Sequence, residues 1–178
     1  MVIFLAVYMD DILNYLAKEN ISAAVKNYPF WKDMKKVVLT ETEKIDNLCQ
    51  KKGKKISLLG HSQGGLIATS IAQNNPSLID KVITLGVPFQ GTKTAYLQYF
   101  ITSCRQMLPG SSYLKELNEK GFPEEVRFYN IIARYDHIVS WKSAILPPAS
   151  NVENIIVVDC GHASLIKKDW LIGEILKD

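Results

Sequence analysis

A serine between two glycines, in Gly60-His61-Ser62-Gln63-Gly64, matches the pattern G-x-S-x-G. An apolar run at residues 55–59 precedes it, and an apolar helical pattern at 64–74 follows it. In that context the pattern predicts a sharp strand-to-helix turn that presents a nucleophilic hydroxyl. We expect Ser62 to be the nucleophile and the Gln63 N–H to donate to a developing oxyanion. The alternative is a glycine-rich turn without chemistry.

A serine nucleophile needs a general base, and the base needs an orienting carboxylate. For a serine on such a turn, the acid follows along the chain and the histidine comes last. His162 directly follows the last apolar run, and Asp136 follows the run before it. Parallel strands would bring both side chains to the same edge of a sheet. We therefore predict a catalytic triad of Ser62, Asp136 and His162.

Each of these assignments has a rival in the sequence. His61 adjoins the serine and is expected to point away from it, whereas His137 is a second candidate base. Asp159 is the rival acid, but it stands only three residues from His162, within or at the end of its strand. We prefer Asp136 and His162 because both follow the ends of predicted strands.

The elements that must position these residues follow from apolar periodicity. Apolar runs predict strands at 2–5, 21–25, 55–59, 81–85, 127–133 and 155–158, and helical spacing predicts helices at 10–17, 34–49, 64–74 and 165–176. Continuous apolar strands separated by helices are typical of a parallel sheet buried on both faces. The sequence thus predicts an α/β fold, with a mostly parallel sheet of about six strands and helices on both faces.

The length of 178 residues fits one domain, 1–178. An excursion between the strands carries several aromatic residues, around positions 92–122. It is interpreted either as a small cap over an apolar pocket or, equally, as a connecting helix with an ordinary core face.

Several segments carry a resemblance to a known family. They are Gly60-His61-Ser62-Gln63-Gly64-Gly65, the segment 84–92 (TLGVPFQGT), Ser112-Tyr113-Leu114-Lys115-Glu116-Leu117, Tyr135-Asp136-His137-Ile138-Val139 and Gly161-His162-Ala163-Ser164-Leu165. From about Lys55 onward the chain resembles the lipase and esterase branch of the α/β-hydrolases, close in size to the minimal bacterial lipases. The resemblance implies Ser62 as nucleophile, Asp136 as acid, His162 as base and carboxylic esters as substrates.

The N-terminal part departs from that family. Members usually have a His-Gly pair after the first of these strands, where a second oxyanion N–H arises, but this chain reads FLAVYMDD at residues 4–11. Either Val7 or Tyr8 supplies this N–H from a tighter loop, or the second donor is weak or missing. The loss of one donor would cost roughly 3 kcal/mol of transition-state stabilisation.

The composition indicates which kinds of ligand and which cellular compartment are expected. A net charge of +3 does not favour nucleic acid, and no stretch is long enough to span a bilayer. Three cysteines without metal-ligand spacing point to a reducing compartment, and Met1 to Met9 lacks a signal-peptide pattern. We expect a cytoplasmic protein without metal or organic cofactor, acting on a small-molecule or lipid ester, with transient contact to a lipid surface as an option.

The sequence therefore predicts a lipase or carboxylesterase that forms an acyl-enzyme on Ser62. A thioesterase or acyltransferase would use the same triad. A binding module that retains the turn but has an impaired oxyanion hole is the alternative outside enzymes.

Overall fold

The computed structural model describes residues 1–5 and 10–177, and in this part of the chain six strands form one parallel sheet. The strands are β1 (Val2–Leu5), β2 (Ala23–Val25), β3 (Ile56–His61), β4 (Ile79–Leu85), β5 (Arg127–Ala133) and β6 (Val152–Val157). Their order across the sheet is β2-β1-β3-β4-β5-β6, and every neighbouring pair is parallel. The predicted α/β fold is confirmed.

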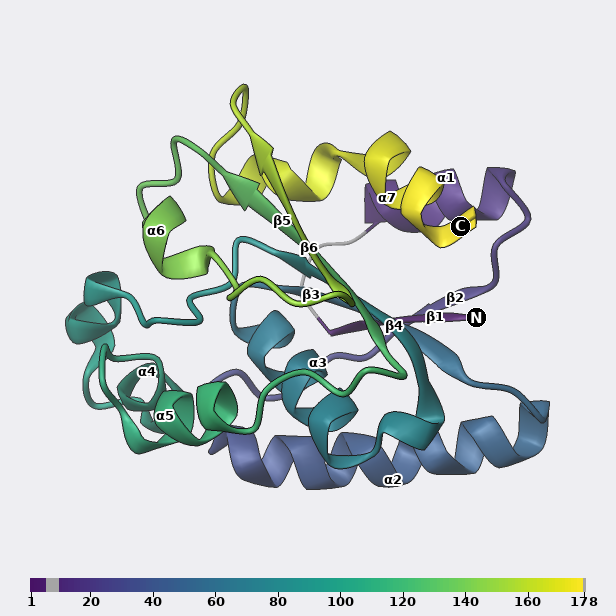
Figure 1. Ribbon diagram of the computed structural model, residues 1–178, viewed down its shortest axis with the longest axis horizontal. Helices are drawn as coiled ribbons and strands as arrows, with labels where there is room; N and C mark the ends of the chain where they lie inside the picture. The colour runs from purple at the N-terminus through teal and green to yellow at the C-terminus, as the bar shows by residue number, and fades with distance from the viewer. Residues whose placement is uncertain (6–9, 178) are drawn as a thin grey trace.

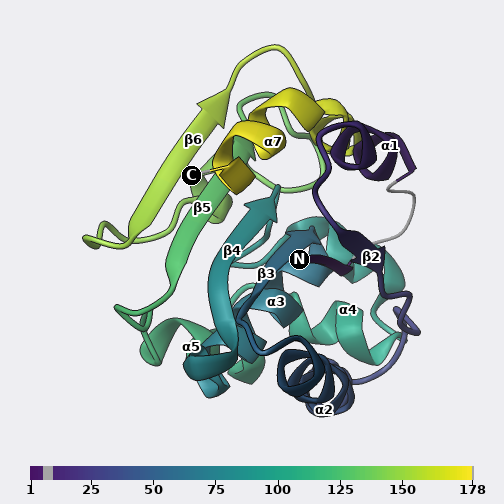
Figure 2. The same cartoon turned by 90° about the vertical axis from the view of Figure 1, so that its right-hand side faces the viewer.

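Helices cover both faces of this sheet. They are α1 (Asp10–Lys18), α2 (Met34–Lys52), α3 (Gln63–Asn74), α4 (Thr102–Gln106), α5 (Ser112–Glu119), α6 (Trp141–Ala144) and α7 (Asp169–Lys177), with 3₁₀ turns η1 (Pro76–Leu78), η2 (Lys93–Gln98) and η3 (Ala163–Lys167). Helices α1 and α7 pack together on one face, whereas α2 and α3 lie on the other (Figures 1 and 2).

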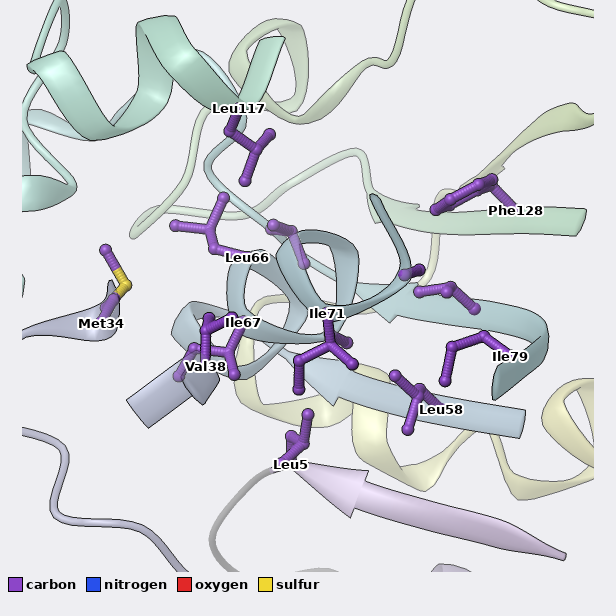
Figure 3. Close-up of a cluster of buried hydrophobic side chains, with 14 of the residues drawn as sticks. Leu5, Met34, Val38, Leu58, Leu66, Ile67, Ile71, Ile79, Leu117 and Phe128 are labelled. Carbon is purple, nitrogen blue, oxygen red and sulfur yellow. The ribbon is translucent and has the colours of Figure 1, made fainter. Parts of the chain in front are cut away.

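The two faces of the sheet bury separate apolar clusters. Figure 3 shows the cluster under α2 and α3, in which Leu58 from β3 and Ile79 from β4 meet Ile71 from α3. The other cluster lies under α1 and α7 and includes Phe4 and Leu59. A strand between two clusters must be apolar at every position, and this explains the continuous apolar runs in the sequence.

The long helix α2 is delimited by its own end residues. The Asp33 carboxylate accepts hydrogen bonds from the N–H groups of Lys35 and Lys36, which satisfies donors that the first turn leaves without partners. Gly53 ends the helix with φ of 64°, a left-handed conformation that costs glycine little.

The closing helix differs from the single helix predicted at 165–176. The turn η3 ends at Lys167, and α7 begins at Asp169 after Lys168, whose ψ of 46° is not helical. Lys168 pairs with Asp159 through Nζ at 2.7 Å, and Asp169 places a negative charge on the first turn of the new helix. The apolar periodicity continues across Lys168, so the sequence pattern did not predict this break in the helix.

The boundaries of β6 also differ from the prediction, since the strand begins at Val152 rather than Ile155. It lies at the edge of the sheet, and its residues are half-buried or exposed, so the apolar run marked only part of it. None of the helices among the described residues is both long and apolar enough to cross a membrane.

Candidate active site

Ser62 stands on the turn between β3 and α3 in a backbone conformation rare for a non-glycine residue. Its φ is 52° and its ψ is −122°, and such a conformation costs about 1–3 kcal/mol. The Ser62 N–H donates to the Leu85 carbonyl at 2.9 Å, and the Gly65 N–H donates to the Ser62 carbonyl at 3.0 Å. These hydrogen bonds hold the predicted nucleophile at the end of β3, as the sequence pattern indicated.

Gly64 is required by the close approach of another strand. A Cβ at this position would lie 1.5 Å from the carbonyl oxygen of Leu5, the last residue of β1. The end of β1 therefore lies against the turn that carries Ser62. Val7 and Tyr8, the predicted sources of the second oxyanion N–H, lie outside the described residues.

Asp136 and His162 lie in hydrogen-bond contact. The Asp136 Oδ2 is 2.6 Å from His162 Nδ1, and the side chains are 1% and 14% exposed, respectively. The other carboxylate oxygen accepts from the N–H groups of Ile138 (2.7 Å) and Val139 (2.8 Å). Burial raises the pKa of Asp136, but these three hydrogen bonds outweigh burial and hold the pKa below its usual value. An ionised Asp136 therefore holds the His162 ring through Nδ1.

The end of β4 joins this pair to the serine turn. Gly86 has φ of 56°, and a Cβ there would lie 3.1 Å from His162 Nδ1 and 3.3 Å from Asp136 Oδ2. The preceding residue, Leu85, accepts the hydrogen bond from Ser62. All three predicted triad residues thus lie at the same edge of the sheet. No hydrogen bond within the described ranges links the Ser62 hydroxyl to His162, and such bonds often tighten only when substrate binds.

His61 has a role that the sequence did not indicate. Its Nε2 donates to the backbone carbonyl of His162 at 3.1 Å, and the two rings lie 4.6 Å apart. Burial, and to a lesser extent the neighbouring His162, lower the pKa of His61 to about 4. A neutral His61 therefore braces the loop that carries His162. The pattern G-x-S-x-G allows any residue at the position of His61, so it could not predict this contact.

Gln63 connects the turn to two distant segments. Its backbone N–H begins α3, where helix N–H groups lack partners within the helix, as an oxyanion donor requires. Its side-chain Nε2 donates to the Phe30 carbonyl at 3.0 Å, and the Ser103 hydroxyl donates to the same carbonyl. The loop before α2 and helix α4 are therefore fixed against the turn.

The rival residues lie apart from this arrangement. The Asp159 side chain is 68% exposed and pairs with Lys168, and His137 is exposed. Over residues 1–5 and 10–177, neither makes a hydrogen bond to His162. The same part of the chain contains no cluster of three or more His, Cys, Asp or Glu side chains suited to a metal ion.

Solved structures of lipases share this fold. The mature lipase BlEst2 of Bacillus licheniformis aligns over 99% of this chain and 90% of its own, with a TM-score of 0.79 and 18% identity. This chain spans only 49% of the propeptide form of that lipase, at a TM-score of 0.81 and 18% identity over 98% of this chain. The monoacylglycerol lipase of Paleococcus ferrophilus gives a TM-score of 0.73 at 12% identity, over 98% of this chain and 93% of its own. At these identities the likeness concerns the fold.

A family model shows which family this chain belongs to, a question that similarity of fold alone does not answer. No match was found among curated proteins. The model described as palmitoyl protein thioesterase matches residues 7–135, more than two thirds of the chain. The matched range contains the Ser62 turn and ends one residue before Asp136. The expected likeness to α/β-hydrolases of the lipase and esterase type is confirmed, and the chain belongs to the palmitoyl protein thioesterase family.

Proposed function

We propose that this chain is a serine hydrolase that cleaves acyl esters. Ser62 is the nucleophile, His162 the general base and Asp136 the residue that orients it. The observation that carries the proposal is the 2.6 Å contact between Asp136 and His162, at the sheet edge where Ser62 stands in strained backbone. Groups arranged in this way typically perform acyl transfer.

The first step forms the acyl-enzyme. His162 Nε2 takes the Ser62 proton while the Oγ–carbon bond forms and the carbonyl electron pair moves to oxygen. The Gln63 N–H stabilises this oxyanion, and Val7 or Tyr8 remains the predicted second donor. When the oxyanion collapses, the carbon–oxygen or carbon–sulfur bond breaks, and His162 protonates the departing alkoxide or thiolate.

The second step releases the acid. Water loses a proton to His162 as its oxygen attacks the acyl carbon, and the Ser62 oxygen leaves and regains the proton. Asp136 stays ionised throughout and stabilises the imidazolium in both steps. Its lowered pKa suits this role.

The decisive experiment compares the purified protein with Ser62→Ala on p-nitrophenyl butyrate. Ser150→Ala, at an exposed serine, is the matched control. We expect turnover and covalent labelling by a fluorophosphonate probe in the parent and the control, and neither in Ser62→Ala. Folded parent protein without turnover or labelling would favour the non-catalytic binding module.

A thioesterase is the second candidate, because the family description names thioesters. Octanoyl esters and octanoyl thioesters with matched leaving groups would distinguish the two activities by their kcat/KM values. Added alcohol or amine acceptors would reveal an acyltransferase as acyl product other than the free acid.

We also propose that the segment 92–122 caps the site and contacts a lipid surface. Four large side chains in and after η2 are exposed: Tyr96, Leu97, Tyr99 and Phe100, with Leu97 83% and Phe100 80% exposed. The segment has four basic residues, Lys93, Arg105, Lys115 and Lys120, and two acidic residues, Glu116 and Glu119, so its net charge is positive, which suits an anionic membrane. Co-sedimentation with phosphatidylglycerol vesicles should weaken in the double variant Leu97→Ser/Phe100→Ser. It should be unchanged in Leu39→Ser, which alters a 66% exposed leucine on α2.

A further inference from the structure

A groove of about 680 Å³ is lined in part by Asp136. One wall is formed by residues 90–94, which follow β4, together with Pro109, and the other wall comes from residues 136–143, which follow β5. Asp136 contacts His162, the residue that would protonate a leaving group, so the groove begins one residue away from that base.

Two cations line this groove, and a third lies next to one of its lining residues. Lys93 and Lys142 line it, and the Arg134 guanidinium stacks on the ring of Trp141, another lining residue, at 3.9 Å from its centroid. Within the described ranges, none of these three cations forms an ion pair with a carboxylate. Asp136 is the only acidic residue of the lining, and its oxygens are occupied by His162 and two backbone N–H groups. The groove therefore has an uncompensated positive charge.

The walls of the groove are held in place by hydrogen bonds. Asn130, which is fully buried, donates to the Ala144 carbonyl at 2.8 Å and so anchors α6. The Gln90 N–H donates to the Ser143 carbonyl at 2.9 Å, and the Ser143 hydroxyl donates to Gly91. The two walls are thus tied to each other, and the cations stand around a preformed site.

We propose that this groove binds the leaving group of the acyl substrate, and that this leaving group bears phosphate. The inference rests on the proposed function, because it says where the leaving group binds in the same acyl-transfer reaction. A guanidinium over an indole ring has a planar set of donors that matches phosphate oxygens, and the two lysines add positive charge that does not depend on a fixed geometry. Two sources have this chemistry: a nucleotide thiol such as coenzyme A, and the headgroup of a phospholipid.

The kinetic test uses two matched pairs of substrates with the same acyl chain. Octanoyl-coenzyme A is compared with octanoyl-pantetheine, and monooctanoylglycerol phosphate with monooctanoylglycerol. We expect a lower KM for the phosphate-bearing member of at least one pair, and the pair that shows the difference identifies the source. Equal KM values within both pairs would overturn the proposal.

Variants of the groove make the test specific to these residues. Arg134→Gln should raise KM for the preferred phosphate-bearing substrate by about tenfold, since a charge-assisted hydrogen bond is lost. Lys142→Gln should raise it by about threefold, because an exposed charge contributes less. Both variants should leave kcat and the kinetics of the neutral partner substrate unchanged. Lys51→Gln, at an exposed lysine of α2, is the control. A similar KM increase for the neutral substrate would contradict binding of phosphate at this groove.

Binding without turnover separates this inference from the proposed function. Isothermal titration of the Ser62→Ala variant with free coenzyme A and with glycerol phosphate requires no catalysis. Binding that weakens in Ser62→Ala/Arg134→Gln supports the groove even if the parent hydrolyses no substrate. Absence of binding of both ligands, in a parent that does hydrolyse esters, would refute the groove while the hydrolase stands.

Discussion

Acidification should destabilise the fold through His61. Its pKa falls from 6.5 to about 4 on folding, because burial disfavours the charged ring. The unfolded chain therefore binds a proton that the folded chain excludes, so stability is fully present above pH 6.5 and is lost as the pH falls toward 4. A difference of 2.5 pKa units, at 1.36 kcal/mol each, corresponds to about 3 kcal/mol. The nearby titratable groups are His162, which contributes to this lowering of the pKa, and Asp136, which opposes it.

The assay is urea unfolding at a series of pH values between 7 and 4, for the parent and for His61→Gln. Glutamine keeps an N–H donor for the His162 carbonyl but does not titrate, so subtraction of the two curves removes the contribution of ordinary carboxylates. We expect the free energy of unfolding to fall by about 3 kcal/mol more in the parent than in the variant. Equal pH dependence of the two proteins would refute the assignment of a neutral, buried His61.

The other predictions concern the triad and the turn. Asp136→Asn should lower kcat by roughly 10³–10⁴-fold, because the His162 ring loses its ionised partner, whereas Asp159→Asn should change it by less than about twofold. Steady-state kinetics of both variants on one ester decides this, and comparable losses would contradict the choice of acid. Gly64→Ala should lower Tm by roughly 10 °C or prevent folding, since its Cβ would lie 1.5 Å from the Leu5 carbonyl oxygen. Thermal unfolding within about 2 °C of the parent would show that β1 does not press on this turn.

Much of the fold was readable from local patterns. Apolar runs such as Val2–Leu5 and 127–133 marked strands buried on both sides, and these became β1 and β5. Helical spacing at 34–49 marked α2, because a helix that covers a sheet must present one apolar stripe to it. The glycines around Ser62 predicted the turn, since only small residues allow the close approach of β1. Where burial was incomplete, as at the edge strand β6, the pattern located the strand but misplaced its start.

Other features depend on contacts between segments that are distant in the sequence. Asp136 and His162 are 26 residues apart and His61 and His162 are 101 apart, so no periodicity could report their contacts. The position of Val7 and Tyr8 as oxyanion donors remains a prediction.

The order of the elements, the parallel sheet and the turn that carries Ser62 could be predicted from the sequence, because each depends on which residues are apolar or small within a short window. Only the tertiary structure decided which carboxylate meets His162, that a neutral His61 braces its loop, and that three cations gather around one groove. Those features arise from the packing of β4, β5 and the loops after them. This packing consists of many weak contacts between segments that are distant in the sequence, so no single stretch of sequence contains them.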